Sequence, residues 1–301
     1  MENLLVSFSG GETSAFMCQY LLKHKSNDFN MVFCFANTSL ENEETLIFCQ
    51  KVSKYFNFKL HYIEANVSMI DGIGTGFKEV TFDTLKRNGE IFEDVIKKYG
   101  IPNTNFPHCT REMKSVPIKK FGQQYFKGEH FKMAIGIRHD EMDRQNKKDE
   151  LSFIYPLIHM KPTKKPVINF YWSNMPFRLN LKGYEGNCMN CWKKSDPKLL
   201  RIAKDYPNRF EFTKKMESKY SYFIPERRLI EANKNGIEIN LPIHFFRKNK
   251  SSIDILNASK NFDGHIFDDS QNYNIQLDLF ELNDYDLHNE SCEVFTECND
   301  N

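Results

Sequence analysis

The chain has 301 residues, of which 40% are hydrophobic, enough for one large domain or two modest ones with a real core. No stretch approaches the roughly 18 apolar residues of a membrane span, and no secretory signal precedes the first apolar run, so we expect no membrane partner. Eight cysteines without such a signal predict a reducing, cytoplasmic setting, where they serve as core residues, metal ligands or redox groups.

The formal net charge of +1 conceals an uneven distribution. Residues 261–301 hold eleven of the forty acidic residues and no Lys or Arg, so residues 1–260 carry 41 basic against 29 acidic side chains. A basic body suits an anionic partner such as a nucleotide, tRNA or DNA. The acidic tail is either a solvated appendage or a segment that shields the basic face.

The first predicted element is a buried strand over residues 4–8, followed at once by Gly10 and Gly11 and by a helix that opens at Thr13. Glycines allow φ > 0 and let an anion approach the backbone, and the first helical turn adds unpaired N–H donors. This arrangement suits a phosphate or pyrophosphate. The alternative is a turn that merely needed glycine.

Strands and helices then alternate: a helix over 13–25, a strand over 31–36, a helix over 43–56 and a strand over 58–63. This alternation predicts an α/β, Rossmann-like, doubly wound and mainly parallel sheet, with ligands at the carboxyl ends of the strands. Asn37 and Thr38, which end the second strand, should lie beside the glycine turn and contact base or ribose.

Residues 71–76 are glycine-rich and are interpreted as a flexible surface loop, and a helix is expected near 91–99. A strand over 131–137 contains Gly136 and is followed by Arg138 and Arg144, where a planar fork of donors matches a phosphate or sulfate. Because acidic residues are interleaved with these arginines, a salt-bridged loop is the alternative.

From about residue 161 the pattern changes to helices and loops, and residues 161–250 hold 20 basic and 8 acidic side chains. Helices are expected over 196–204, with Ser195 as the cap, over 209–220 and over 251–261. We therefore expect three parts: a nucleotide-binding α/β domain over 1–160, a basic helical region over 161–260 and an acidic tail over 261–301.

Cys188 and Cys191 form a C-x-x-C pair, a spacing that lets two thiolates bind one metal ion. Cys109, on a loop beside His108, is the best third ligand, and the fourth could be His108, a tail cysteine or a non-protein group. These residues predict a metal site, Zn²⁺ or an iron–sulfur cluster. A redox dithiol of Cys188 and Cys191 is the alternative.

Four patches resemble phosphoadenosine phosphosulfate (PAPS) reductase-like proteins of the adenine nucleotide alpha-hydrolase superfamily. They are residues 9–14 (Ser-Gly-Gly-Glu-Thr-Ser), 36–45, 109–117 and 136–144. The resemblance implies an alpha-hydrolase-type domain that binds adenine nucleotide, ATP or PAPS, and a [4Fe-4S] cluster nearby. Three departures are visible: Thr13 stands where the family usually has Asp, His108 breaks a tandem cysteine, and the reductase motif is reduced to Glu-Cys-Asn at 297–299.

The loops and the resemblance together predict the site residues. Nucleotide contacts are expected from Ser7, Ser9, Gly10, Gly11, Glu12, Thr13, Ser14, Asn37, Thr38, Gly136 and Arg138, and catalytic roles from Ser9, Thr13, Arg138 and Arg144.

Three functions remain open on the sequence. The first is cleavage of Mg²⁺-bound ATP to AMP and pyrophosphate, which activates an acceptor for sulfur transfer or nucleic-acid modification. The second is reduction of PAPS by thioredoxin with Cys298 as nucleophile, and the third is a non-catalytic nucleotide- or nucleic-acid-binding module.

Overall fold

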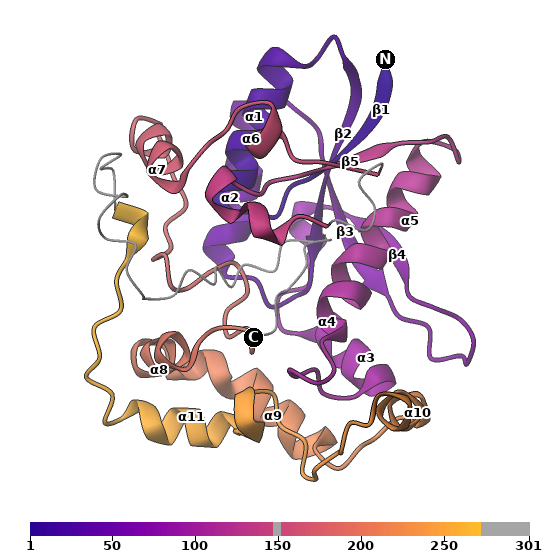
Figure 1. Cartoon of the computed structure of the whole chain (residues 1–301), viewed down its shortest axis with the longest axis vertical. Coiled ribbons are helices and arrows are strands. Elements are labelled where there is room, and N and C mark those ends of the chain that lie inside the picture. Colours follow the sequence, from indigo (N-terminus) through magenta and orange to yellow (C-terminus); the bar gives the residue numbers. More distant parts are fainter. Residues whose placement is uncertain (147–151, 272–301) are drawn as a thin grey trace.

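A six-stranded sheet forms the centre of the protein, whose computed structural model describes residues 1–146 and 152–271 (Figure 1). Its spatial order is β4-β3-β2-β1-β5-β6, and every neighbouring pair is parallel except β3 and β4. The strands are β1 (Glu2–Ser7), β2 (Phe29–Asn37), β3 (Leu60–Asn66), β4 (Gly76–Val80), β5 (Lys132–Ile135) and β6 (Phe153–Ile154). The predicted mainly parallel, doubly wound α/β fold is confirmed.

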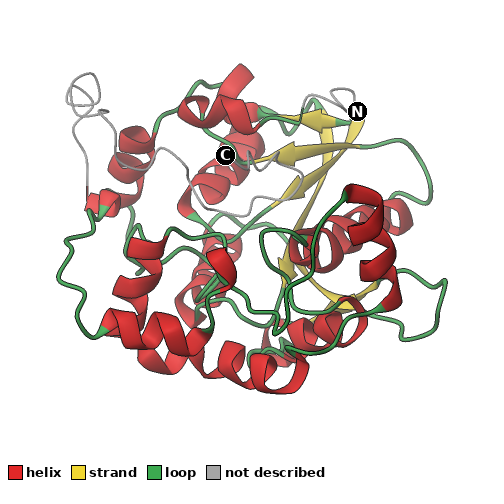
Figure 2. Cartoon of the chain, turned by 60° about the horizontal axis from the view of Figure 1, so that its bottom comes forward, coloured by secondary structure: helices red, strands yellow, loops and turns green. Residues whose placement is uncertain are grey.

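The central strands are apolar along their whole length because both faces of the sheet are covered. In β1, Leu4 and Val6 pack into one core, while Leu5 between them packs into the core on the opposite face. Helices α1 (Glu12–His24), α2 (Glu43–Tyr55) and α7 (Lys165–Ser173) contribute side chains to the first core, and α5 (Val116–Tyr125) contributes to the second. Figure 2 shows these helices on the two sides of the strands.

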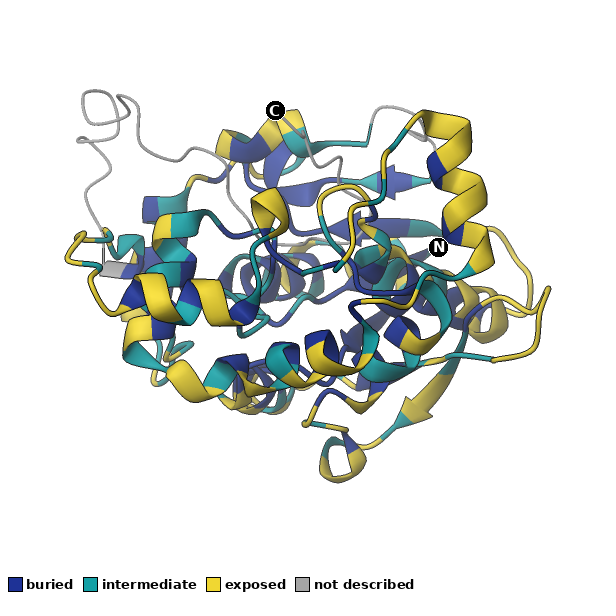
Figure 3. Ribbon diagram, turned by 90° about the horizontal axis from the view of Figure 1, so that it is seen from below, coloured by how far each residue is buried: buried dark blue, intermediate teal, exposed yellow. Residues whose placement is uncertain are grey.

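A third core lies among the helices beyond the carboxyl ends of the strands (Figure 1). It joins α3 (Glu90–Tyr99) to α8 (Asp196–Asp205), α9 (Glu211–Tyr220) and α11 (Ser252–Ser259), with α10 (Glu226–Asn235) beside them. Figure 3, seen from below, shows buried and exposed residues alternating along the helices at the front. Because this core takes residues from both sides of position 160, the expected division there stays a prediction.

Several local features differ from expectation. The helix that contains Pro117 begins earlier, as α4 (His108–Thr110), and passes through a π-helical turn (Arg111–Ser115) before α5. Gly76 opens an antiparallel edge strand, β4, which the glycine-rich spacing did not suggest. Ser195 does precede α8, but its hydroxyl makes no capping hydrogen bond. The remaining short helix, α6 (Pro156–His159), follows β6.

None of the helices in the described ranges is long and apolar enough to span a bilayer. The acidic tail, apart from residues 261–271, and the cysteines at 292 and 298 lie outside the described residues.

Candidate functional site

The turn between β1 and α1 forms a cradle of backbone N–H groups at the carboxyl edge of the sheet. Gly10 has φ +87°, and a Cβ there would lie 2.6 Å from Thr45 Cγ2, so only glycine fits this turn. Within the described chain, the N–H groups of residues 10–13 donate no hydrogen bond, and the helix proper begins with Ala15 N–H donating to Gly11 O at 3.0 Å. N–H groups in such a turn, at the start of a helix, are suited to an anion.

The hydroxyl groups of Ser9 and Ser14 hold the turn between β1 and α1 in place by hydrogen bonds. The Ser14 hydroxyl accepts from Ser9 N at 3.2 Å, lies 2.9 Å from Ser9 Oγ and donates to Gly11 O at 3.0 Å. Ser14 is fully buried against Gly136, where a Cβ would come within 2.9 Å of Ser14 Cα. In this structure, Ser14 and Gly136 therefore shape the loop and bring β5 close to it.

Glu12 points away from the cradle and anchors a distant segment. Its carboxylate receives two hydrogen bonds from Arg178, Nε to Oε1 and Nη2 to Oε2, each at 3.0 Å, and one from Leu179 N at 3.2 Å. Its carbonyl accepts from Trp172 Nε1 at 2.9 Å. Sequence reasoning missed Arg178, because nothing near either residue in the chain reveals this pairing over 166 positions.

Arg138 extends from the end of β5 toward the cradle. Its Nη1 donates to Thr13 Oγ1 at 3.4 Å, while its other contacts are Asp140 Oδ1, 3.0 Å from Nε, and Glu141 Oε2, 3.2 Å from Nη1. Burial disfavours the charge of Arg138, but the carboxylates of Glu141 and Asp140 more than compensate and raise its pKa. Arg144 binds Glu141 at 2.6 Å. The loop is therefore salt-bridged, as the alternative predicted, and Arg138 also contacts Thr13, while phosphate binding by Arg138 and Arg144 stays a prediction.

The polar residues at the ends of β1 and β2 are buried. Asn37 donates to Glu64 Oε1 and to Lys86 O, each at 2.8 Å, and Thr38 Oγ1 donates to Glu41 at 2.7 Å. Ser7 lies within β1 and is 2% exposed. Asn37 therefore positions the strand end, while Thr38 also lines a neighbouring pocket. The nucleotide-contacting roles of these three residues stay predictions.

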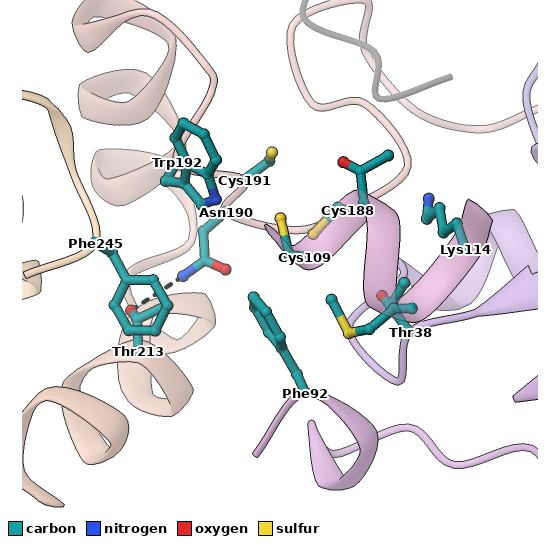
Figure 4. A pocket seen from close by; sticks show the side chains of 12 residues that line it. Thr38, Phe92, Cys109, Lys114, Cys188, Asn190, Cys191, Trp192, Thr213 and Phe245 are labelled. Carbon is teal, nitrogen blue, oxygen red and sulfur yellow. Dashed lines mark hydrogen bonds between the residues drawn. The ribbon is translucent and has the colours of Figure 1, made fainter. Parts of the chain in front are cut away.

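The structure brings the three singled-out cysteines to one pocket of about 40 Å³, which Thr38, just after β2, also lines (Figure 4). Cys109 comes from α4, whereas Cys188 and Cys191 come from the C-x-x-C turn, and none of the three is in a disulfide. Phe92, Met113, Trp192 and Phe245 form most of its apolar wall. Trp192 Nε1–H is buried without a hydrogen-bond partner.

The metal-site prediction is not supported by this geometry. Within residues 1–146 and 152–271, no three His, Cys, Asp or Glu side chains are grouped so that they could hold a metal ion. His108 donates from Nε2 to Gly100 O at 3.1 Å, and burial, together with the charge of Arg228, lowers its pKa to about 3. No step below therefore passes through Zn²⁺ or an iron–sulfur cluster.

The C-x-x-C turn is fastened directly to the nucleotide loop, which the sequence did not suggest. Asn187 Nδ2 donates to Ser9 O at 3.0 Å, and Asn187 O accepts from Asn42 N at 2.9 Å. Cys188 forms an antiparallel bridge with Glu41. The cysteine pocket and the anion cradle are thus neighbours through the segment that follows β2.

The fold and the cradle together define a nucleotide-binding α/β protein. Residues 3–169 match the phosphoadenosine phosphosulfate reductase domain family, so the chain belongs to that family, and the suspected resemblance is confirmed.

Two relatives are similar over much of the chain. An uncharacterized nin region protein of Escherichia phage lambda is 28% identical over 204 residues, which are 67% of this chain and 69% of the phage protein. An uncharacterized protein of Methanocaldococcus jannaschii is 25% identical over 226 residues, 69% of this chain but only 40% of the archaeal protein.

Proposed function

We propose that the protein binds Mg²⁺-bound ATP in the cradle of residues 9–14 and cleaves it between the α and β phosphates. The observation that carries this proposal is the row of N–H groups at residues 10–13, which donate to no atom of the described residues, together with the hydrogen bond from Arg138 to Thr13. Such donors bind phosphate oxygens through their partial positive charge. Membership of a family whose fold binds adenine nucleotides supports the same ligand.

In the proposed cleavage of ATP, negative charge develops on the departing pyrophosphate. An acceptor with an O–H or N–H group attacks the α-phosphorus, its proton passes to solvent, and pyrophosphate leaves with the bonding electrons of the α–β bridge. The N–H groups stabilise the charge that grows on the departing pyrophosphate, and one such donor is typically worth about 10²–10³ in rate. The adenylated acceptor then exchanges AMP for sulfur, an amine or water.

Thr13 determines which groups hold Mg²⁺ in this proposal. Its hydroxyl accepts from Arg138 and supplies no carboxylate, so Mg²⁺ arrives as part of the ATP complex, held by phosphate oxygens. Arg138 itself is balanced by Asp140 and Glu141, which hold its guanidinium in place beside the cradle. Its fork can then bind a phosphate oxygen without a large rearrangement.

The acceptor is proposed to be anionic, tRNA or DNA. The support is the charge of residues 161–250, the region that contains the C-x-x-C turn: it holds 20 basic and only 8 acidic side chains. Three thiols in a pocket beside the cradle support sulfur as the group that is finally transferred.

The test is to incubate the protein with Mg²⁺ and ATP labelled at the α-phosphate, alone and with tRNA or duplex DNA, and to separate AMP, ADP and adenylated acceptor. We expect AMP and pyrophosphate without ADP. Arg138→Lys, which keeps the charge but loses the fork, should reduce the rate at least about tenfold, whereas Arg201→Lys, in a partly exposed i,i+4 pair with Asp205 within α8, should not.

Other products would assign another function. Nucleotide that binds tightly and is recovered intact with every acceptor would make the protein a binding module. Sulfite released from PAPS with thioredoxin would make it a reductase, a reaction whose proposed nucleophile, Cys298, lies outside the described residues.

A further inference from the structure

The segment Gly186–Lys194, here called the thiol loop, carries Cys188 and Cys191 and is attached along one side to residues 40–42. Asn42 contributes two hydrogen bonds, from N to Asn187 O at 2.9 Å and from Nδ2 to Gly186 O at 2.8 Å. Met189 N donates to Leu40 O at 3.0 Å. The backbone on both sides of Cys188 is therefore held in place by the segment that follows β2.

On its other side, the thiol loop reaches the nucleotide cradle through one side chain. Asn187 Nδ2 donates to Ser9 O at 3.0 Å, and it lies 3.6 Å from the position that a Cβ on Gly11 would occupy. An amide group has two N–H donors and an acceptor oxygen. The bond to Ser9 is the only one that the Asn187 side chain makes to the described residues, so its second N–H stands at the rim of the cradle without an acceptor.

We propose that Asn187 is a positioning residue that couples occupation of the cradle to the reactivity of Cys188. This inference rests on the proposed function, because it requires a polyphosphate in the cradle. A phosphate oxygen bound to the N–H groups of residues 10–13 offers the acceptor that the second N–H of Asn187 lacks. Asn187 is then held by both Ser9 and the ligand, which restricts the thiol loop and the access of solvent to Cys188.

A coupling between the cradle and Cys188 must act in both directions. If nucleotide stabilises one arrangement of the thiol loop and alkylated Cys188 disfavours that arrangement, alkylation must weaken nucleotide binding by the factor by which nucleotide disfavours the alkylated form. Couplings of this kind typically lie between about 5-fold and 150-fold. Because Cys188 is half-buried rather than inaccessible, its alkylation rate can report the change.

The experiment measures the alkylation rate of each cysteine in the full-length protein by peptide mass spectrometry, with and without Mg²⁺ and α,β-methylene ATP, which cannot be cleaved at the proposed bond. Nucleotide affinity is measured in parallel by calorimetry. In the wild type, saturating nucleotide should slow alkylation of Cys188 at least about fivefold. In Asn187→Asp, which keeps the shape but loses both donors, the effect should fall below about twofold at saturating nucleotide.

Asn190→Ala is the matched control in the same loop. Asn190 donates to Arg209 O and to Thr213 Oγ1, each at 3.2 Å, on the side away from the cradle, so this variant loosens the loop but should keep the nucleotide effect. Cys34 and Cys49, which are fully buried, should stay unreactive in every folded variant.

The outcomes separate the two proposals. If nucleotide binds but does not alter Cys188, or if Asn187→Asp keeps the full protection, the coupling is wrong and nucleotide binding stands. Equal loss of protection in Asn190→Ala would likewise overturn it in favour of general loosening. If no nucleotide binds the wild type, both proposals fail together.

Discussion

The backbone of the cradle can be tested by adding a single methyl group at Gly10. Alanine there must adopt φ +87°, which costs about 1–2 kcal/mol for a residue with a Cβ. The new Cβ would also lie 2.6 Å from Thr45 Cγ2 and 3.0 Å from Phe35 Cε2, both in buried side chains. Overpacking of this kind costs about 1–3 kcal/mol. We therefore expect Gly10→Ala to lower the free energy of unfolding by about 3 kcal/mol.

Two other glycines separate the contributions. Gly72 has φ +79° but no heavy atom within 4 Å of its hypothetical Cβ, so Gly72→Ala should show the backbone strain alone, about 1–2 kcal/mol. Gly11 has φ −93° and its nearest such neighbour is 3.6 Å away, so Gly11→Ala should change stability by less than about 1 kcal/mol.

Urea denaturation followed by far-ultraviolet circular dichroism measures all three variants, with equal slopes against denaturant as the check that the transitions are comparable. The reasoning would be refuted if Gly10→Ala were no less stable than Gly72→Ala, because the close approach to Thr45 would then cost nothing.

Three further predictions concern groups around the site. Arg178→Gln removes the bidentate partner of the buried Glu12 carboxylate and should cost about 2–4 kcal/mol in urea denaturation, against less than about 1 kcal/mol for Arg201→Gln in its more exposed pair; equal losses would contradict the idea that burial of Glu12 makes its pair the costlier one to break. The pKa of His108 is lowered to about 3, chiefly by burial and then by Arg228, so the unfolded chain binds more protons than the fold between about pH 3 and 6.5. Stability should therefore rise with pH across that window, and His108→Gln should flatten the rise by up to about 5 kcal/mol, since each pH unit of the shift contributes about 1.4 kcal/mol; an unchanged pH profile would show that the ring is not held neutral. Burial raises the pKa of the Cys34 thiol far above its usual value, so a thiol reagent at pH 8 should modify Cys34 only after unfolding in urea, and rapid labelling of the native protein would argue against this core.

The parts of the fold that could be predicted are those determined by residues that are close together in the sequence. The run at 4–8, the glycines at 10 and 11 and the apolar spacing of the next helix are contiguous, and each restricts the backbone within a few residues. The same holds for the alternation of strands and helices, because a parallel sheet covered on both faces imposes long apolar strands separated by helices. The two short edge strands, β4 and β6, escaped this pattern, because each has too few residues to show an apolar run.

The candidate site also has features that the sequence predicted and features that it did not. Position in the chain sufficed to place Arg138 at a strand end beside the cradle and to single out the three cysteines that share one pocket. It said nothing of which carboxylates hold Arg138, because side-chain pairing depends on rotamers and burial rather than on order along the chain. It also suggested a metal for the cysteines, which the described geometry does not support.

What only the tertiary structure decided is how the second half of the chain closes on the first. Arg178 meets Glu12 across 166 positions, and Asn187 meets Ser9 across 178. Neither Arg178 nor Asn187 belongs to a periodic pattern, and each reaches its partner only when Trp172, Phe177 and Leu179 pack into the first core and Tyr184 and Trp192 into the third. Local sequence determines the backbone conformation of the cradle, whereas long-range packing determines which side chains surround it, because contacts between distant segments form only once the whole core has closed.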